Sequence, residues 1–470
     1  MFIITLIIMA FSFGDDYSNQ IIARVGDKVI TAQDFIERAE YTPRPLYCRG
    51  NSSTDKRIIL NSLIGEKLFS MEMKKDIPSE IDKYLIGRRN QKMREMLFNT
   101  ITSNAIEKIN NFSHWKSLSA IEYNISYLSI SNSNLLSEIQ NSISIGKSLS
   151  NIYASYNSIS EIPKRENINL FSAGNRALRE ELFSKVWNRG DIIGPIKTDD
   201  NVFMFVQIDS RKRIVNLNQS ASTQLDDELT NLIASHIKET EYQKFVSDIM
   251  LEMKFDLNPA SYIGFSESIR SWYNEISEAG SELNKISPRL NISSPDEILL
   301  VLNGEDVTIK QISDWMSIHP LVFRDGYYKD LHFSDQLKYA IADLIRDRNL
   351  NDRAISLNLH RHPEVISEYE KWYDNYRAIA QRKEIIDQES EFNSTKVTTE
   401  LNEYFFNVSQ KYSEQIGINL EVLDSISLSS IDMATYNKIG PYKLAVPLFP
   451  VITNTYKLNY GQPISMENYD

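Results

Sequence analysis

A stretch near the N-terminus recurs in the second half of the chain, and this repeat limits the possible folds more than any other feature of the sequence. The segment IIARVGDKVITAQDFIERAEYTPRPLY begins at Ile21, and LLVLNGEDVTIKQISDWMSIHPLVF begins at Leu299. Each reads as a short strand, a glycine-containing turn, a second short strand, a threonine suited to cap a helix, and a helix. With one residue skipped after the turn, the matched pairs are Gly26 with Gly304, Val29 with Val307, Thr31 with Thr308, Phe35 with Ile312 and Pro43 with Pro320. An apolar helix follows each segment, so we interpret the pattern as a duplication.

Composition and charge place the chain among globular proteins of several domains. It has 470 residues, of which 42% are hydrophobic and 24% charged, which is ordinary for a globular chain. The net charge of -12 argues against nucleic acid as a partner, because binding phosphates requires a basic surface. A single cysteine, Cys48, excludes an intramolecular disulfide framework and a thiolate metal cluster.

The first residues resemble a targeting segment. Residues 2–11 are apolar but too few to span a bilayer as a mature helix, and small residues follow at 12–14. We therefore predict a signal peptide over residues 1–14, either cleaved or retained as a membrane anchor. The predicted location is periplasmic or otherwise extracytoplasmic. A buried first strand or helix is the alternative interpretation.

Residues 121–213 have the pattern of a compact α+β unit. The predicted order is a strand at 121–130, two short helices hinged at Gly146, an amphipathic helix at 175–189, and a closing hairpin at 190–209. A long helix is predicted over 219–254.

The sequence contains few constellations typical of catalysis. His360 and His362 are the one histidine cluster, and no cysteine or acidic signature surrounds them. The G-x-S-x-G, P-loop and G-x-G-x-x-G motifs do not occur. We predict no metal site and no cofactor.

Two motifs within residues 121–213 carry a resemblance to a known family. GKSLSNIYASY at 146–156 and GDIIGPIKT at 190–198 resemble segments of parvulin-type peptidyl-prolyl isomerases (rotamases of the PpiC-like kind). The flanking GDKVITAQDF, with helices before the unit and a long helix after it, is similar to the SurA and PrsA type of periplasmic foldase. The resemblance covers about residues 20–255, and more weakly 299–390 through the repeat.

The resemblance implies where a site would lie. Parvulins use two histidines, one on the first strand and one on the last, and these positions are occupied here by Ser126 and Phe203. We therefore assign no catalytic residue. The apolar candidates for a peptide-binding pocket are Leu128, Phe183, Trp187, Phe203 and Phe205, although Phe183 and Trp187 are equally consistent with plain core.

The predicted fold class is α+β: a largely helical chaperone domain with an inserted parvulin-like α+β domain and a partly repeated C-terminal helical region. The predicted parts are a signal peptide (1–14), an N-terminal helical chaperone domain (15–118), the parvulin-like domain (119–216), a long helix packing back on the N-terminal domain (217–276), a linker (277–297), a helical domain repeating the N-terminal motif (298–395), and a C-terminal segment of unknown fold (396–470).

Three functions stay open on the sequence. The first is an exported chaperone or foldase that binds unfolded or nascent envelope and secreted proteins, with weak or absent isomerase activity. The second is an active prolyl isomerase with a divergent site, in which Ser126 and nearby Tyr127 or Tyr123 replace the family's polar network. The third is a structural scaffold of the cell envelope.

Overall fold

The computed structural model shows an α+β protein of largely helical character, which confirms the predicted fold class. It describes residues 19–130, 135–155, 164–198, 202–214, 219–279, 294–324, 331–386, 394–428, 438–439, 442–443 and 445–464. The predicted signal peptide therefore lies outside the described residues. Within these ranges, no helix is both long and apolar enough to cross a membrane.

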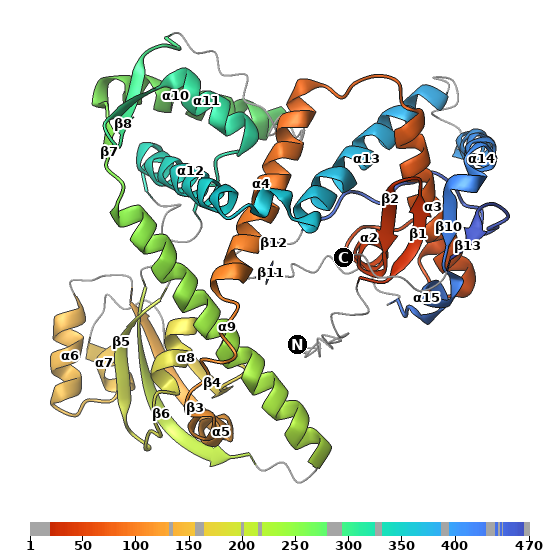
Figure 1. The fold of residues 1–470 in the computed structure, drawn as a ribbon. Coiled ribbons are helices and arrows are strands. Elements are labelled where there is room, and N and C mark those ends of the chain that lie inside the picture. The colour runs from red at the N-terminus through yellow and green to blue at the C-terminus, as the bar shows by residue number, and fades with distance from the viewer. Residues whose placement is uncertain are drawn as a thin grey trace.

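A four-stranded sheet forms the centre of what we call the first module, at the right of Figure 1. The hairpin of β1 and β2 leads into α2 and α3, and two short strands from the end of the chain complete the sheet in the order β13-β10-β1-β2. The bounds are β1 Ile21–Val25, β2 Lys28–Thr31, α2 Ala32–Glu40, α3 Ser53–Glu72, β10 Ile416–Ile418 and β13 Gln462–Pro463.

The second module repeats this plan with three strands, in the order β7-β8-β9. Both hairpins carry a bulge at the same place, and in both a threonine, Thr31 or Thr308, forms a capping box at the start of the next helix. The bounds are β7 Phe255–Leu257, β8 Ile298–Leu302, β9 Glu305–Thr308, α11 Ile309–Ile318 and α12 Phe333–Ser356.

The strand registers align the two hairpins without a gap. Ile21 opposes Thr31 as Ile298 opposes Thr308, so the residue skipped in the sequence alignment is not needed. The two turns differ instead. In the first, Gly26 takes the positive φ, +63°, at the leading position, whereas in the second both Asn303 (55°) and Gly304 (+86°) do. These are the two usual two-residue hairpin turns, and they place the glycine one residue apart.

Each half of the chain supplies a strand to the hairpin of the other half. The helix–strand–helix segment α9-β7-α10 completes the second hairpin, and α14-β10-α15 completes the first. The backbone bonds match: Asn258 N donates to the carbonyl of Leu299 (2.9 Å), and Asn419 N donates to that of Ile22 (2.8 Å). The bounds are α9 Gln219–Leu251, α10 Pro259–Ala279, α14 Ser394–Lys411 and α15 Leu420–Ser425. The long helix predicted over 219–254 is α9, and the rest of the predicted part 217–276 contains the strand β7 and a second helix, α10.

The long helices also cross between the halves (Figure 1). α4 (Ser79–Ile101) packs on α12, and α13 (Pro363–Ile385) packs on α3. Where α4 and α13 meet, Arg88 pairs with Glu368 (3.3 Å) and Lys92 with Glu364 (3.1 Å). Met71 on α3 packs against the core of the first module, and Met93 and Met96 on α4 pack with α9, α12 and α13.

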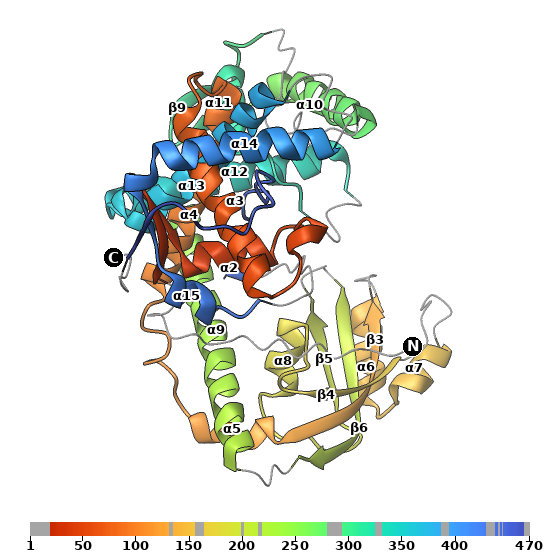
Figure 2. The same ribbon diagram turned by 90° about the vertical axis from the view of Figure 1, so that its right-hand side faces the viewer.

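The inserted domain, at the lower left of Figure 1, has a sheet in the order β4-β3-β6-β5. The helix α9 joins it to the two modules: Leu229 and Ile233 pack on the sheet's core, and Phe245 and Ile249 pack with α4 and α12. Figure 2 shows α9 running beside this domain. The bounds are α5 Phe112–Ser119, β3 Ile121–Ile130, α6 Leu136–Ser144, α7 Leu149–Ser155, β4 Lys164–Asn169, α8 Arg176–Leu182, β5 Ile192–Lys197 and β6 Phe203–Arg213, and two further short strands elsewhere are β11 Lys438–Ile439 and β12 Tyr442–Lys443.

Candidate functional site

Ser126 and Phe203, which the resemblance to parvulins predicts at the histidine positions, lie on the adjacent antiparallel strands β3 and β6. Ser126 opposes Gln207, and Phe203 opposes Ile130. Residues that oppose one another share a face of the sheet, as do alternate residues along a strand. Ser126 and Phe203 therefore lie on one face but four positions apart along it, and they do not form a cross-strand pair.

The Ser126 hydroxyl belongs to a small, satisfied polar network. Its Oγ donates to Oδ2 of Asp209 (2.5 Å), and Nε2 of Gln207 donates to the other carboxylate oxygen (3.2 Å). Oε1 of Gln207 in turn accepts from the backbone N–H of Leu149 at the start of α7 (3.0 Å). The network connects α7 to the sheet. The hydroxyl proton of Ser126 is already donated to the Asp209 carboxylate.

Helices α6 and α7 cover this face with apolar side chains. Leu128 is 2% exposed and Phe205 is fully buried. The cluster around them consists of Leu128, Ile130, Ile139, Leu149, Ile152 and Phe205. The face is a filled core at these positions. Of the three predicted pocket residues on it, Phe203, at the end of the strand, is the one that is partly exposed.

The other two predicted pocket residues lie on the opposite face. The ring of Phe183 packs against that of Tyr123, with centroids 5.7 Å apart. The backbone N–H of Trp187 donates to the Tyr123 hydroxyl (3.1 Å). The structure thus divides the five predicted residues between two faces of one sheet, and their role in peptide binding stays a prediction.

The first module binds residues 445–464, which we call the C-terminal segment. This binding site was not predicted from the sequence. Apart from β13 it has no regular structure. Buried or partly buried side chains bind its main-chain carbonyls. Leu448 O accepts from Arg38 Nη2 (2.5 Å) and from Asn375 Nδ2 (2.9 Å), and Ala445 O accepts from Arg88 Nη2 (3.2 Å).

Side chains of helix α3 bind further carbonyls of the C-terminal segment. Asn61 Nδ2 donates to the carbonyls of Thr455 (2.7 Å) and Lys457 (3.2 Å), and Ser62 Oγ donates to that of Thr453 (3.3 Å). Both donors are completely buried beneath the segment. No sequence pattern predicts these contacts, because the donors and the acceptors lie almost 400 residues apart and a main-chain carbonyl belongs to every residue type.

Apolar side chains of the C-terminal segment enter the core between these polar contacts. Phe449, Ile452 and Tyr460 are buried there. The Tyr460 ring meets Phe405 edge-on at 5.7 Å, and its hydroxyl donates to Oδ1 of Asn61; burial raises the pKa of this phenol. Beyond it, β13 joins β10 as a parallel strand. The first module therefore holds a segment of irregular backbone through its main-chain carbonyls and through three buried side chains.

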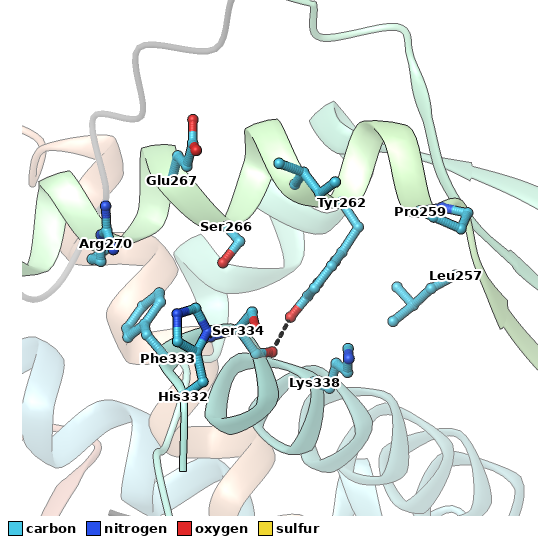
Figure 3. A pocket seen from close by; sticks show the side chains of 11 residues that line it. Leu257, Pro259, Tyr262, Ser266, Glu267, Arg270, His332, Phe333, Ser334 and Lys338 are labelled. Atoms are coloured by element: carbon cyan, nitrogen blue, oxygen red, sulfur yellow. Dashed lines mark hydrogen bonds between the residues drawn. The ribbon is translucent and has the colours of Figure 1, made fainter. Parts of the chain in front are cut away.

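The second module has a cavity of about 520 Å³ between α10 and α12 (Figure 3). Tyr262 forms one wall and donates from its hydroxyl to the carbonyl of Ser334 (2.5 Å). Burial raises the pKa of this tyrosine. The other lining residues include Leu257, Pro259, Ile263, Ser266, Glu267, Arg270, His332, Phe333 and Lys338. Among the described residues no group of three or more His, Cys, Asp or Glu could hold a metal ion.

Comparisons with protein families, curated proteins and solved structures do not establish the family of this chain. No family model matches the chain, and no curated protein matches it. Among solved structures the chain is similar to the foldase protein PrsA from Streptococcus pneumoniae str. Canada MDR_19A, at 11% identity and a TM-score of 0.20, over 46% of this chain and 90% of that one. A likeness at this level assigns neither the fold nor the function.

Proposed function

We propose that this protein is an exported, periplasmic or otherwise extracytoplasmic, chaperone of the parvulin-containing foldase type. It would bind extended segments of unfolded envelope or secreted proteins, with weak or absent prolyl isomerase activity. The observation that carries the proposal is the hold on the C-terminal segment. Asn61, Ser62 and Arg38 all donate to main-chain carbonyls, which every polypeptide presents.

The inserted domain supports the low isomerase activity. Rotation about a prolyl amide meets a barrier of about 20 kcal/mol, so a catalyst must bind the twisted amide more tightly than the planar one. Ser126 already donates to Asp209, and Leu128 and Phe205 fill the space beside it. Phe203 offers no polar group at the other family position.

The alternative function is an active isomerase, and one observation favours it. The network of Ser126, Gln207 and Asp209 places polar groups at one of the two family positions. If α7 moves away from the sheet, this network would face a bound proline.

Two assays on the full-length protein separate these functions. The first measures light scattering from an unfolded client protein, and the second measures proline-limited refolding of a small protein. Suppressed aggregation without faster refolding is the expected result, and Ser126→Ala should leave the suppression unchanged. Faster refolding, equal to that of an active parvulin at the same concentration, would establish the isomerase instead. If the protein shows neither activity, the third hypothesis, a structural scaffold of the cell envelope, remains.

A further inference from the structure

We propose that the cavity between α10 and α12, together with the open edge of β7, binds an extended segment of an unfolded protein that carries an aromatic side chain. This inference rests on the proposed chaperone function and assigns it a site. The occupant would lie along β7 as the end of the C-terminal segment lies along β10.

The cavity has the position in the second module that residues 457–464 occupy in the first module. The hairpin registers make Leu257 equivalent to Ile418. The sequence spacing that pairs Thr31 with Thr308, continued along the chain, matches Lys338 on α12 with Asn61 on α3. The same spacing matches the buried Leu337 with the buried Leu60. In the first module both counterparts contact the segment: Ile464 N donates to the carbonyl of Ile418 (3.1 Å), and Asn61 binds the Lys457 carbonyl and Tyr460. In the second module Leu257 and Lys338 line the cavity.

Exposure differs between the modules as this equivalence requires. All three residues of β10 are buried, whereas Asp256 in the middle of β7 is exposed and its neighbours are half-buried. Among the described strands only β8 pairs with β7. A strand edge with no partner presents main-chain donors and acceptors that an extended peptide can pair with.

The size and lining of the cavity define the occupant. A volume of about 520 Å³ is typical of sites that enclose a ligand group. Leu257, Ile263 and Phe333 give it apolar walls, and Ile263 is 62% exposed. In the first module Tyr460 fills the matching space. We therefore infer that an aromatic side chain of the occupant fills the cavity of the second module.

One difference between the modules adds a charge preference. A Cβ atom at Gly417 would lie 2.6 Å from Cγ2 of Ile464, so that position in the first module admits no side chain. The second module has Asp256 there. An occupant of the second module would therefore carry a basic residue, in place of Ile464, near this carboxylate.

Site-directed crosslinking tests the proposal on the full-length protein. Cys48 is buried and burial raises its pKa to about 12, so a new exposed cysteine can be labelled selectively. A photo-crosslinker is placed at Ile263→Cys, with matched variants at Leu46→Cys on the first module and Val186→Cys on the inserted domain; these three residues are 62%, 81% and 47% exposed. The probe is reduced, carboxymethylated α-lactalbumin, which stays unfolded.

The expected result is a crosslink to the probe at least about fivefold stronger from position 263 than from the other two, competed by a peptide of residues 453–464. Crosslinks mainly from position 46 or 186, or an adduct from 263 to this chain itself, would overturn the inference. If the variants still suppress aggregation in that case, the proposed function stands. A protein that neither crosslinks nor suppresses aggregation would overturn the function as well.

A substitution gives an independent measure. Ile263→Arg places a charge in the apolar wall at an exposed position, and should weaken binding of the same probe about tenfold, which is 1.4 kcal/mol. Leu46→Arg is the matched control and should leave the affinity unchanged. Circular dichroism checks that both variants are folded. Unchanged affinity in a folded Ile263→Arg protein would overturn the inference.

Discussion

The two modules share one plan, yet their long helices face different surroundings. Helix α3 is buried on nearly all sides from Ile58 to Ser70, because the C-terminal segment lies over the side that α13 and the sheet leave open. Helix α12 keeps an exposed side, with Lys338 and Tyr339 where α3 has Asn61 and Ser62. The hairpin-and-helix plan therefore forms without a covering segment in the second module, and the outer side chains of α3 in the first module are adapted to the presence of one.

A glycine in α3 shows this adaptation directly. A Cβ atom at Gly65 would lie 2.8 Å from Cγ2 of Ile452 in the C-terminal segment. The equivalent residue of α12 is Ala342, which is half-buried. Glycine within a helix costs about 1 kcal/mol relative to alanine, so its place in α3 is explained by the close approach of the segment.

The reciprocal exchange of strands makes the two halves dependent on one another. The first hairpin lacks β10 until the second half of the chain is in place, and the second hairpin receives β7 from the first half. The arrangement is that of two intertwined copies joined in one chain. The inserted domain lies between α4 and α9 in the first copy only, since α13 and α14 are separated by eight residues (386–393).

Local features of the fold were predictable from the sequence. The hairpins, their threonine caps and the apolar stripes depend on residues within about ten positions of each other, and their patterns are visible in the printed sequence. The alignment of the repeats needed a skipped residue because Gly26 and Gly304 hold different positions in two kinds of turn. The strands β7, β10 and β13 have two or three residues each, too few to show any periodicity, and their partners lie far away along the chain.

The candidate site was less predictable for a related reason. Apolar residues such as Leu128 and Phe183 have the same sequence appearance whichever face of a sheet they cover. Only the alternation of β3 and the placement of α8 separate the two sets. The carbonyl-binding role of Asn61 was hidden, since an asparagine within an apolar helix gives no indication of what it binds.

The comparison of the modules predicts that the first depends on its covering segment. Truncation after Lys443 removes β13 and three buried side chains, Phe449, Ile452 and Tyr460. Each buried side chain of this kind contributes about 1.5–3 kcal/mol, so the free energy of unfolding should fall by at least about 5 kcal/mol. Urea unfolding, followed by circular dichroism, measures the loss. A truncated protein as stable as the full chain would show that the segment is not part of the core.

Exchanging one residue between the modules should affect them unequally. Gly417→Asp forces a side chain against Ile464, because the new Cβ atom would lie 2.6 Å from Cγ2 of Ile464, and it should cost about 3 kcal/mol even though Arg24 opposes this position on β1. The reverse change, Asp256→Gly, removes an exposed side chain from β7 and should alter the stability by no more than about 1 kcal/mol. Equal losses in the two variants, measured by urea unfolding, would contradict the assignment of β7 as an open edge.

Alanine substitutions in α3 and α12 should differ in their effect on stability by a smaller amount. Asn61→Ala leaves the carbonyls of Thr455 and Lys457 without this donor and should cost about 1–3 kcal/mol. Lys338→Ala removes an exposed side chain that pairs with Asp335 at 2.9 Å, and should change the stability by less than about 1 kcal/mol. Thermal unfolding of the two proteins at neutral pH gives the values. A larger loss for Lys338→Ala would mean that α12, too, is covered.

Acid should weaken the two helix contacts between the halves, α13 on α3 and α4 on α12, because each contains a buried, paired aspartate. Burial would raise the pKa of Asp374 on α13, but Lys67 and Lys28 outweigh it and hold the pKa below its usual 3.8. At the other crossing, burial also opposes ionisation of Asp347 on α12, and the bond from His319 and the charge of Arg94 lower its pKa in the same way.

A carboxyl whose pKa is lowered by folding stabilises the folded state at every pH above its unfolded value, and this contribution is lost as the pH falls through the folded value. Stability should therefore change little from pH 7 to 5 and fall below about pH 4. Asp374→Asn lowers the stability at neutral pH, because it leaves Lys67 facing a neutral group, but it should flatten the acid dependence. Asp347→Asn should flatten it similarly, and urea midpoints between pH 7 and 3 measure both slopes. If only one variant flattens the curve, the two crossings are not energetically equivalent, and the pseudo-symmetry of the halves extends to their geometry but not to their charges.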